Sequence, residues 1–333
     1  MTMKRLKKMS AALATAFLGM LGAAQVGAAG DYLLATASTG GTYYPVGVAL
    51  STMVKVKLHA KNGINMSAIN SAGSAENIRL LRDDQAHFAL VQALYGAYAW
   101  NGTGPLKNEG PQKGLRAITM LWQDVEHFLI SSKHVKTGTI SDALVIKGVA
   151  GFGKKQSGSL GSSQTIFSNL GVEIDDQFDL LYGGYGALAD AMGDGRADLI
   201  NTPAGVPVGA VSKLMAAQRN SVRLLSFTDE QAAKADGGLD LWTRYVIPAN
   251  TYPGQSSPVE TIAQPNFLAV QAQVPEEDVY LITKTIYENL RFLGSIHMAT
   301  RDMTIEKAII GLPIPLHPGA ARYYREVGLD IPD

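Results

Sequence analysis

The chain contains no cysteine among its 333 residues. For a protein that leaves the cytoplasm, this absence excludes a disulfide framework and also a lipid attached to an N-terminal cysteine. Long apolar runs are scarce as well: beyond residues 9–26, no stretch is long and apolar enough to span a bilayer. We therefore expect a chain that is stabilised by its hydrophobic core, without disulfide bonds and without a lipid anchor.

The first 29 residues have the three parts of a secretory signal peptide. Lys4, Arg5, Lys7 and Lys8 precede the apolar run, and the small residues 27–29 follow it. A retained membrane anchor is the alternative, which the weakly hydrophobic, Ala- and Gly-rich run disfavours. We expect residues 1–29 to be cleaved.

The chain has no excess of positive charge that would indicate a polyanionic partner. The formal charge is zero, with 29 Lys and Arg against 29 Asp and Glu; removal of the four basic residues in 1–29 leaves 25 against 29, a charge of −4. Nucleic acid and anionic lipid are therefore not expected as partners.

Motifs for catalysis, metal and nucleotide are missing too. The six histidines include no pair at i, i+4, and no Gly-x-Ser-x-Gly elbow occurs. The segment GKKQSGS (153–159) has Ser159 where a phosphate loop needs lysine, and 151–156 lacks the third glycine of a dinucleotide fingerprint. We expect no catalytic residue, no cofactor and no metal.

Strand patterns alternate with helix patterns in two blocks. Short apolar runs at 32–36, 64–69 and 88–92 open the first block, and runs at 145–152, 178–182 and 199–201 open the second. Helical patterns such as 48–58 and 162–170 separate them, with Gly171 as the stop of the latter. A late strand at 266–271 precedes a helix predicted over 275–298. This alternation predicts an α/β fold with sheets wrapped by helices.

About 300 mature residues suggest two domains of about 150 each. We expect lobe I to comprise 30–130 plus 262–333 and lobe II to comprise 131–261. The late strand is expected to return to the first lobe, so the chain crosses twice, near 131–137 and 249–264. Two crossings of this kind form a hinge.

The loops that follow the strands share one composition: hydroxyls, amides and glycines, without acid, histidine or cysteine. In an open α/β sheet this edge is where ligands bind. Such loops suit hydrogen bonding to a small polar or anionic ligand. The alternative is that these are ordinary turns, which are commonly small and polar.

Five motifs in fixed order resemble one family. They are STGGTYYPVG (38–47), SAGSAEN (71–77), LVQ (90–92), QSGS (156–159) and the late pair VPEEDVY (274–280) with PLHPGA (315–320). The order resembles the TAXI-type solute-binding proteins of tripartite ATP-independent periplasmic (TRAP) transporters, over nearly the whole mature chain. Gln156 and Gly161 differ from the residues that are more common in the family around the Ser-Gly-Ser core.

The resemblance implies a two-lobed periplasmic-binding-protein fold with a hinge between two parallel or mixed sheets. It implies a monomeric periplasmic protein that captures a small organic acid or amino acid, glutamate-like or a 2-oxo dicarboxylate, and delivers it to a TRAP membrane permease. A periplasmic sensor subunit would share fold and site, and an exported hydrolase or lyase would need a base or nucleophile in the cleft. Arg244 is the nearest candidate for an arginine that clamps a carboxylate. Carried over position by position, the ligand contacts are Gly40, Gly41, Thr42, Tyr44, Ser71, Ser74, Asn77, Gln92, Ser157, Gly158, Ser159 and Thr202.

Overall fold

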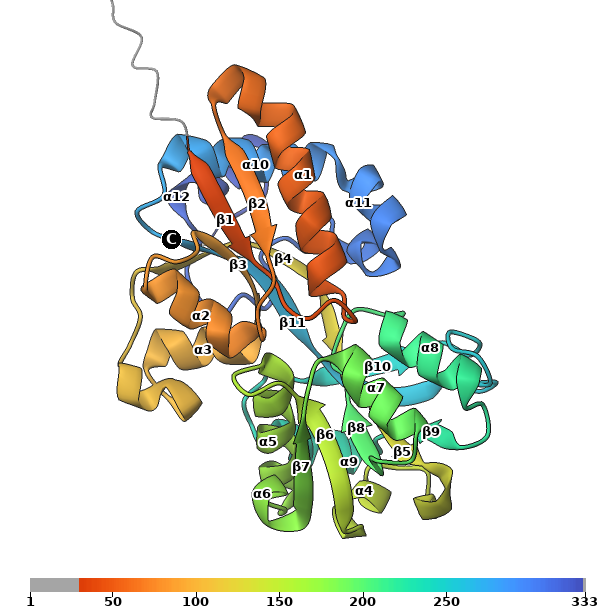
Figure 1. Cartoon of the computed structure of the whole chain (residues 1–333). Coiled ribbons are helices and arrows are strands. Elements are labelled where there is room, and N and C mark those ends of the chain that lie inside the picture. The colour runs from red at the N-terminus through yellow and green to blue at the C-terminus, as the bar shows by residue number, and fades with distance from the viewer. Residues whose placement is uncertain (1–29, 332–333) are drawn as a thin grey trace, which may run out of the picture.

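The computed structural model describes residues 30–331, so the signal-peptide prediction for 1–29 lies outside the described residues. Two mixed sheets form the framework of the molecule (Figure 1). The first sheet has the order β10-β11-β3-β1-β2. Strand β4 also pairs with β11, along the edge of β11 that faces away from β3. Its strands are β1 (Asp31–Ala35), β2 (Asn65–Ile69), β3 (Phe88–Gln92), β4 (Leu115–Val125), β10 (Thr243–Ile247) and β11 (Val259–Gln271).

The second sheet has the order β7-β6-β8-β5-β9. Strand β6 runs parallel to both β7 and β8, whereas β5 is antiparallel to β8 and β9. Parallel or mixed sheets were predicted, and both sheets are mixed. The strands are β5 (Phe128–Ser131), β6 (Gly148–Gly153), β7 (Phe178–Tyr182), β8 (Leu199–Asn201) and β9 (Val222–Leu224).

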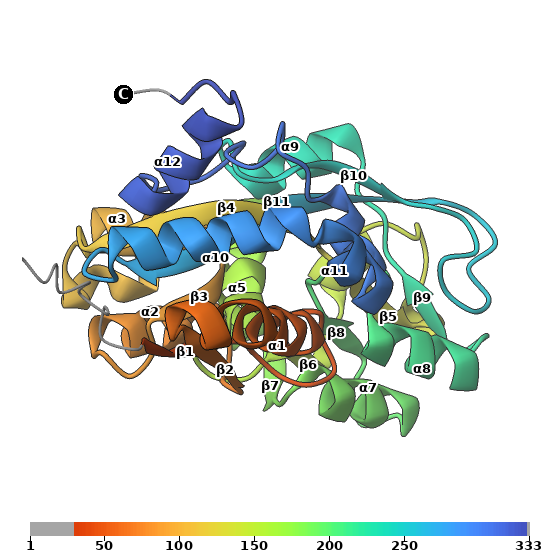
Figure 2. The ribbon, with the colours of Figure 1, turned by 90° about the horizontal axis from the view of Figure 1, so that it is seen from above.

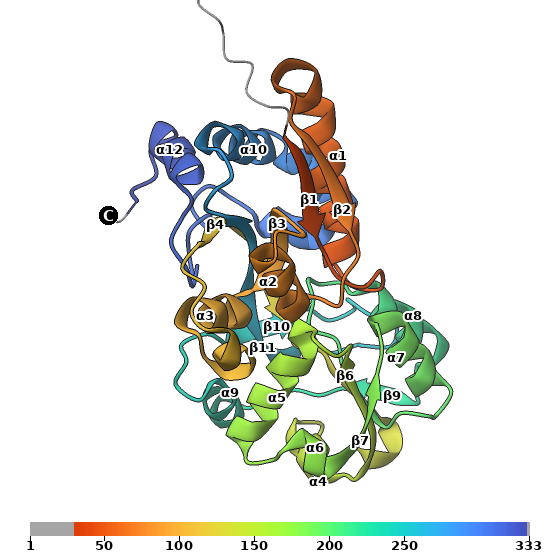
Figure 3. The ribbon, with the colours of Figure 1, turned by 60° about the vertical axis from the view of Figure 1, so that its left-hand side comes forward.

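Helices cover both faces of each sheet (Figures 2 and 3). On the first sheet, apolar side chains of α1, α10 and α12 pack on one face, and those of α2 and α3 on the other. On the second sheet, α5 and α9 cover one face, and α7 and α8 the other. The α-helices are α1 (Tyr43–Asn62), α2 (Ser74–Arg82), α3 (Ala93–Asn101), α4 (Ser141–Val145), α5 (Gly158–Leu170), α6 (Ile174–Gln177), α7 (Tyr185–Gly193), α8 (Gly209–Ala217), α9 (Asp229–Asp236), α10 (Glu276–Glu288), α11 (Leu290–Ile296) and α12 (Pro318–Glu326); three short 3₁₀ helices are η1 (Gly104–Glu109), η2 (Ser132–His134) and η3 (Met298–Asp302).

Local signals set the helix ends. Gly171 ends α5 in the left-handed conformation, with φ of 94°, as predicted. The prediction of one helix over 275–298 is wrong, because the chain breaks between α10 and α11 at Asn289. The side chain of Asn289 donates to the carbonyl of Thr285 at 2.8 Å, and its backbone leaves the helical region at φ −125°. An asparagine that bonds locally to the backbone competes with helix continuation.

The chain changes sheets between Val125 and Phe128, a few residues before the predicted crossing at 131–137. From β9 of the second sheet the chain returns to β10 and β11 of the first sheet, and β11 lies beside this crossing. Glu126 N donates to the carbonyl of Ile262 at 3.0 Å, and Thr261 Oγ1 donates to the carbonyl of Glu126 at 2.9 Å. The two crossing segments therefore support each other; the lobe limits given above stay a prediction.

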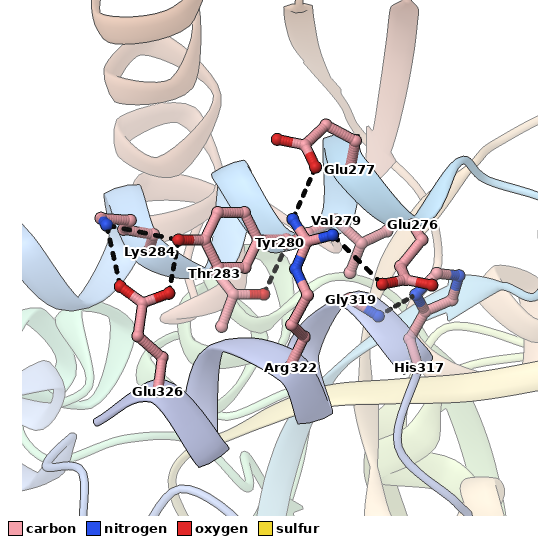
Figure 4. Close-up of polar contacts among 10 residues, drawn as sticks. All are labelled: Glu276, Glu277, Val279, Tyr280, Thr283, Lys284, His317, Gly319, Arg322 and Glu326. Carbon is pink, nitrogen blue, oxygen red and sulfur yellow. Dashed lines mark hydrogen bonds and ion pairs between the residues drawn. The ribbon is translucent and has the colours of Figure 1, made fainter. Parts of the chain in front are cut away.

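An ionic cluster fastens α12 onto α10 (Figure 4). The Arg322 guanidinium contacts Glu276 at 3.2 Å and Glu277 at 2.6 Å, and it lies 3.9 Å from the centre of the Tyr280 ring. The Tyr280 hydroxyl donates to Glu326 at 2.6 Å. These groups are largely exposed, so each pair contributes little on its own. Together they fix how α12 sits on α10.

Candidate functional site

A pocket lies between the two sheets, where the carboxyl ends of strands from both sheets meet. The space between its walls is about 450 Å³, and this figure includes open solvent at the mouth of the pocket. Loops after β1, β2, β6, β7 and β8 contribute to its walls. The predicted contact residues that line it are Gly41, Thr42, Ser74, Gln92, Ser157, Gly158 and Ser159.

The other predicted contacts lie around this pocket. Gly40 and Tyr44 line a shallower depression beside it. Ser71 and Asn77 hold the strand ends together: Ser71 Oγ donates to Asn77 Oδ1 at 2.6 Å, and Asn77 Nδ2 donates to the carbonyls of Thr36 and Leu90. Because both amide hydrogens of Asn77 are used, this side chain positions the loops. Thr202 is fully buried next to the pocket lining.

The amino end of α5 forms one wall. Ser157 is its N-cap, and Ser157 Oγ accepts from Leu160 N at 3.1 Å and lies 3.0 Å from Ser159 Oγ. A Cβ at Gly158 would lie 2.0 Å from Gln92 Oε1, so only glycine permits this approach of the first lobe. The first amides of a helix lack intrahelical partners, and the helix dipole adds positive potential there. This wall suits an anionic group.

Asp124 is the site residue that sequence reasoning missed. It lies at the end of β4, lines the pocket and is 2 % exposed, and it accepts a hydrogen bond from Gln92 Nε2. Burial raises the pKa of Asp124 to about 6, and the Gln92 hydrogen bond acts in the opposite direction. The loops were expected to lack acids, and Asp124 belongs to strand β4 and not to one of these loops. The signal was the group of polar residues Gln123, Asp124, Glu126 and His127 at the end of an apolar strand.

Two tyrosines complete the walls. Tyr43 OH donates to Asn266 Oδ1, and Tyr185 OH donates to the carbonyl of Pro203 at 2.7 Å. Burial raises the pKa of both phenols well above the ordinary value, and the nearby Asp124 carboxylate raises them further. Both tyrosines are therefore neutral hydrogen-bonding groups at physiological pH.

Two buried polar atoms beside the pocket have no protein partner among the described residues: Gln92 Oε1 and Thr202 Oγ1. Buried polar groups are almost always hydrogen-bonded, so unsatisfied ones call for an explanation. A polar ligand held between the sheets would supply partners.

Lys154 is the basic residue that lines the pocket, and its ammonium lies 3.4 Å from the carbonyl of Ser71. Arg244 does not act as the clamp suggested from the sequence. Its guanidinium lies away from the pocket lining and pairs with Asp229 and Glu260, each at 3.2 Å.

The two halves of the molecule touch across the pocket. Thr42 Oγ1 donates to the carbonyl of Gly205 at 3.1 Å. Glu76 N donates to the carbonyl of Gln156 at 3.1 Å. These contacts join loops of the first sheet to loops of the second across the pocket.

Among the described residues that line the pocket there is no histidine, and the hydroxyls of Ser157 and Ser159 hydrogen-bond to each other at 3.0 Å. Within residues 30–331, no group of three or more His, Asp or Glu side chains could hold a metal ion. In the same part of the chain, no helix combines the length and apolarity that a membrane crossing needs.

Solved structures with this architecture are similar over most of their length. A protein from Bordetella bronchiseptica RB50 is 12% identical with a TM-score of 0.53, covering 91% of this chain and 90% of the other. A structure described as a periplasmic transporter is 12% identical with a TM-score of 0.51, covering 89% and 92%. A protein from R. palustris, solved with adipate, is 17% identical with a TM-score of 0.50, covering 89% and 92%. At these identities the likeness concerns the fold.

The family assignment rests on the sequence. A model of the NMT1-like family matches residues 34–328, which include every strand of both sheets except the first residues of β1. The chain therefore belongs to the NMT1-like family and has the fold of the periplasmic binding proteins.

Proposed function

We propose that this protein is the extracytoplasmic solute-binding component of a transporter and that it holds a small carboxylate, an organic acid or amino acid, in the pocket between the sheets. The observation that carries the proposal is the wall formed by Ser157, Gly158 and Ser159 at the amino end of α5, close to buried polar atoms that have no partner among the described residues. A carboxylate gains hydrogen bonds and favourable charge–dipole interaction at such a wall.

The transporter class follows from the motif order. The five motifs resemble TAXI-type proteins, so we propose a TRAP permease, driven by sodium, as the membrane partner, and a periplasmic location for the protein. The R. palustris protein was solved with adipate, a dicarboxylate, which supports an organic acid as ligand. The proposed lobes are 30–130 plus 262–333 and 131–261. The predicted contacts, including those outside the pocket lining, are part of the proposal.

A thermal-shift screen tests the binding function. Residues 30–333 are unfolded and refolded to remove bound ligand, then melted with a panel of amino acids and mono- and dicarboxylates. At a concentration of 100 Kd, a ligand adds about 2.7 kcal/mol to the free energy of unfolding, which raises the melting temperature by several degrees. If no member of the panel shifts it, the proposed ligand class is wrong. Uptake by the reconstituted permease that follows ATP instead of a sodium gradient would contradict the TRAP assignment.

A further inference from the structure

The pocket contains a buried carboxylate that no cation of the described residues neutralises. Asp124 is 2 % exposed, and it forms no ion pair with Lys or Arg in residues 30–331. The only basic side chain of the pocket wall, Lys154, directs its ammonium to the carbonyl of Ser71. An unpaired buried charge is costly, so a site that retains one is suited to a ligand that completes the pair.

A second acceptor lies beside this carboxylate. Gln92 Nε2 is engaged with Asp124, which leaves Gln92 Oε1 directed toward Gly158. This oxygen is buried and has no protein partner. Gln92 and Asp124 thus present a carboxylate and an amide oxygen on the same wall of the pocket. An ammonium group has three donors and no acceptor, so it matches this pair of acceptors.

The neighbouring amino end of α5 has the complementary chemistry. It offers backbone donors and the hydroxyls of Ser157 and Ser159, and Lys154 also lines the pocket. A carboxylate placed against Asp124 would be repelled, whereas at α5 it is stabilised. Acceptors and donors that lie side by side fit a ligand that carries positive and negative charge within a few ångströms.

We propose that Asp124, supported by Gln92, is the specificity-determining residue of this site and selects ligands in which an ammonium group accompanies the carboxylate, that is, α-amino acids, against acids of the same skeleton without it. The inference rests on the proposed binding function and narrows its ligand class. The competing possibility is that a protonated Asp124 donates to a second carboxylate of a dicarboxylic acid, and the experiment separates the two.

The test uses matched pairs that differ only in the amino group: L-alanine with propionate, L-leucine with 4-methylpentanoate, and L-glutamate with glutarate. Each is titrated calorimetrically into residues 30–333, stripped of ligand, at pH 8. We expect one amino acid to bind at least a hundredfold more tightly than its partner acid. In Asp124→Asn, its affinity should fall at least tenfold, whereas the partner acid should bind equally or better.

Two outcomes overturn the inference. One is an amino-free acid that binds the wild-type protein as tightly as its amino acid; the other is an unchanged preference in Asp124→Asn. Either result leaves the proposed binding function intact, whereas a protein that binds no carboxylate in the wider panel contradicts the proposed function itself.

A matched control separates recognition from folding. Asp142 is also a buried aspartate, 2 % exposed, and it binds the backbone amides of 136–138 far from the pocket. Asp142→Asn should retain the wild-type preference between the paired ligands. If Asp124→Asn does not fold, Asp124→Glu provides the second variant: a longer carboxylate keeps the charge, so it should retain a preference for the amino acid at reduced affinity. A loss of that preference in a folded Asp124→Glu protein would contradict the proposal.

Discussion

At the scale of single residues, the site combines groups that stabilise the fold with groups that a ligand must complete. The side chains of Ser71 and Asn77 form hydrogen bonds to each other and to a neighbouring strand end. Asp124 and Gln92 retain unmet charge and an unmet acceptor at the pocket wall. Such a division implies that some binding residues destabilise the empty protein, because their partners are missing until the ligand arrives.

The pH dependence of stability tests this for Asp124. Its pKa is raised to about 6 in the folded protein, against about 3.9 for an unperturbed aspartate. Between about pH 4 and 6 the folded state therefore keeps a proton that the unfolded state has lost. The contribution of this proton to the free energy of unfolding is complete below about pH 4 and is lost as the pH rises through 6. Without ligand at pH 8, Asp124→Asn should be more stable than wild type by about 3 kcal/mol in urea unfolding.

At pH 4 the two proteins should have nearly equal free energies of unfolding. Glu126, whose pKa burial raises to about 7, changes stability in the same direction in both proteins; the Asp124 charge adds to the Glu126 shift, so the difference between the proteins includes this coupling. A variant that is less stable by the same amount at both pH values would show that the Asp124 side chain serves the fold.

Ser159 tests the anion-binding wall. Ser159 Oγ bonds to Ser157 Oγ at 3.0 Å and retains capacity for a second hydrogen bond. A bond to a charged group contributes about 1.5 to 3 kcal/mol, so Ser159→Ala should bind the best ligand of the panel about tenfold or more weakly in calorimetry. Ser168→Ala, at an exposed position of the same helix, is the control. Equal affinity in Ser159→Ala would place the carboxylate elsewhere.

At the scale of elements, α12 depends on close approach more than on its ion pairs. Gly319 lies at its start, where an added Cβ would be 2.2 Å from the carbonyl oxygen of Glu276 and 2.7 Å from the amide of Tyr280. Both are backbone atoms of the α10 region, which cannot move aside as a side chain can. The exposed contacts of Arg322 hold the orientation of α12 (Figure 4), but glycine permits the contact itself.

Gly319→Ala is therefore expected to destabilise the protein by about 1 to 3 kcal/mol or more, the usual cost of overpacking. Arg322→Ala should cost less than about 1 kcal/mol. Gly193→Ala is the matched control, because its Cβ would meet only ordinary contacts at 3.5 Å or more. Thermal melts without ligand measure all three. An equal effect of the two glycine substitutions would contradict the backbone clash.

At the scale of the whole molecule, the walls of the pocket come from both sheets, and the chain passes between the sheets by segments that hydrogen-bond to each other at Glu126 and Ile262. A ligand that touches both sides binds a closed form more tightly than an open one, and this difference in affinity shifts the equilibrium. We predict that the radius of gyration measured by small-angle scattering decreases when the best ligand is added. A bound protein as extended as the empty one would contradict closure.

A larger side chain at the contact between α5 and α3 provides a second test of closure, because it should prevent the two sides from approaching. A Cβ at Gly161 would lie 2.1 Å from the hydroxyl of Tyr95, whose ring is buried. Gly161→Val should hinder closure, weaken ligand binding at least tenfold and leave the scattering profile extended with ligand. Ser168→Val places the same side chain on an exposed part of α5 and should close normally. Wild-type affinity in Gly161→Val would show that this contact is not part of closure.

The features that arise locally could be predicted from the sequence. The alternation of strands and helices, the small polar loops at the strand ends and the stop of α5 at Gly171 follow from periodicity and turn chemistry within a few residues. The break at Asn289 was missed because its apolar pattern continues through it. Only the tertiary structure decided which side chains meet in the pocket. Asp124 reaches the pocket because β4 pairs with β11, with Asp124 opposite Gln264, and because β11 also pairs with β3, which ends at Gln92. Contacts between segments more than a hundred residues apart depend on strand register, and no local pattern encodes that register.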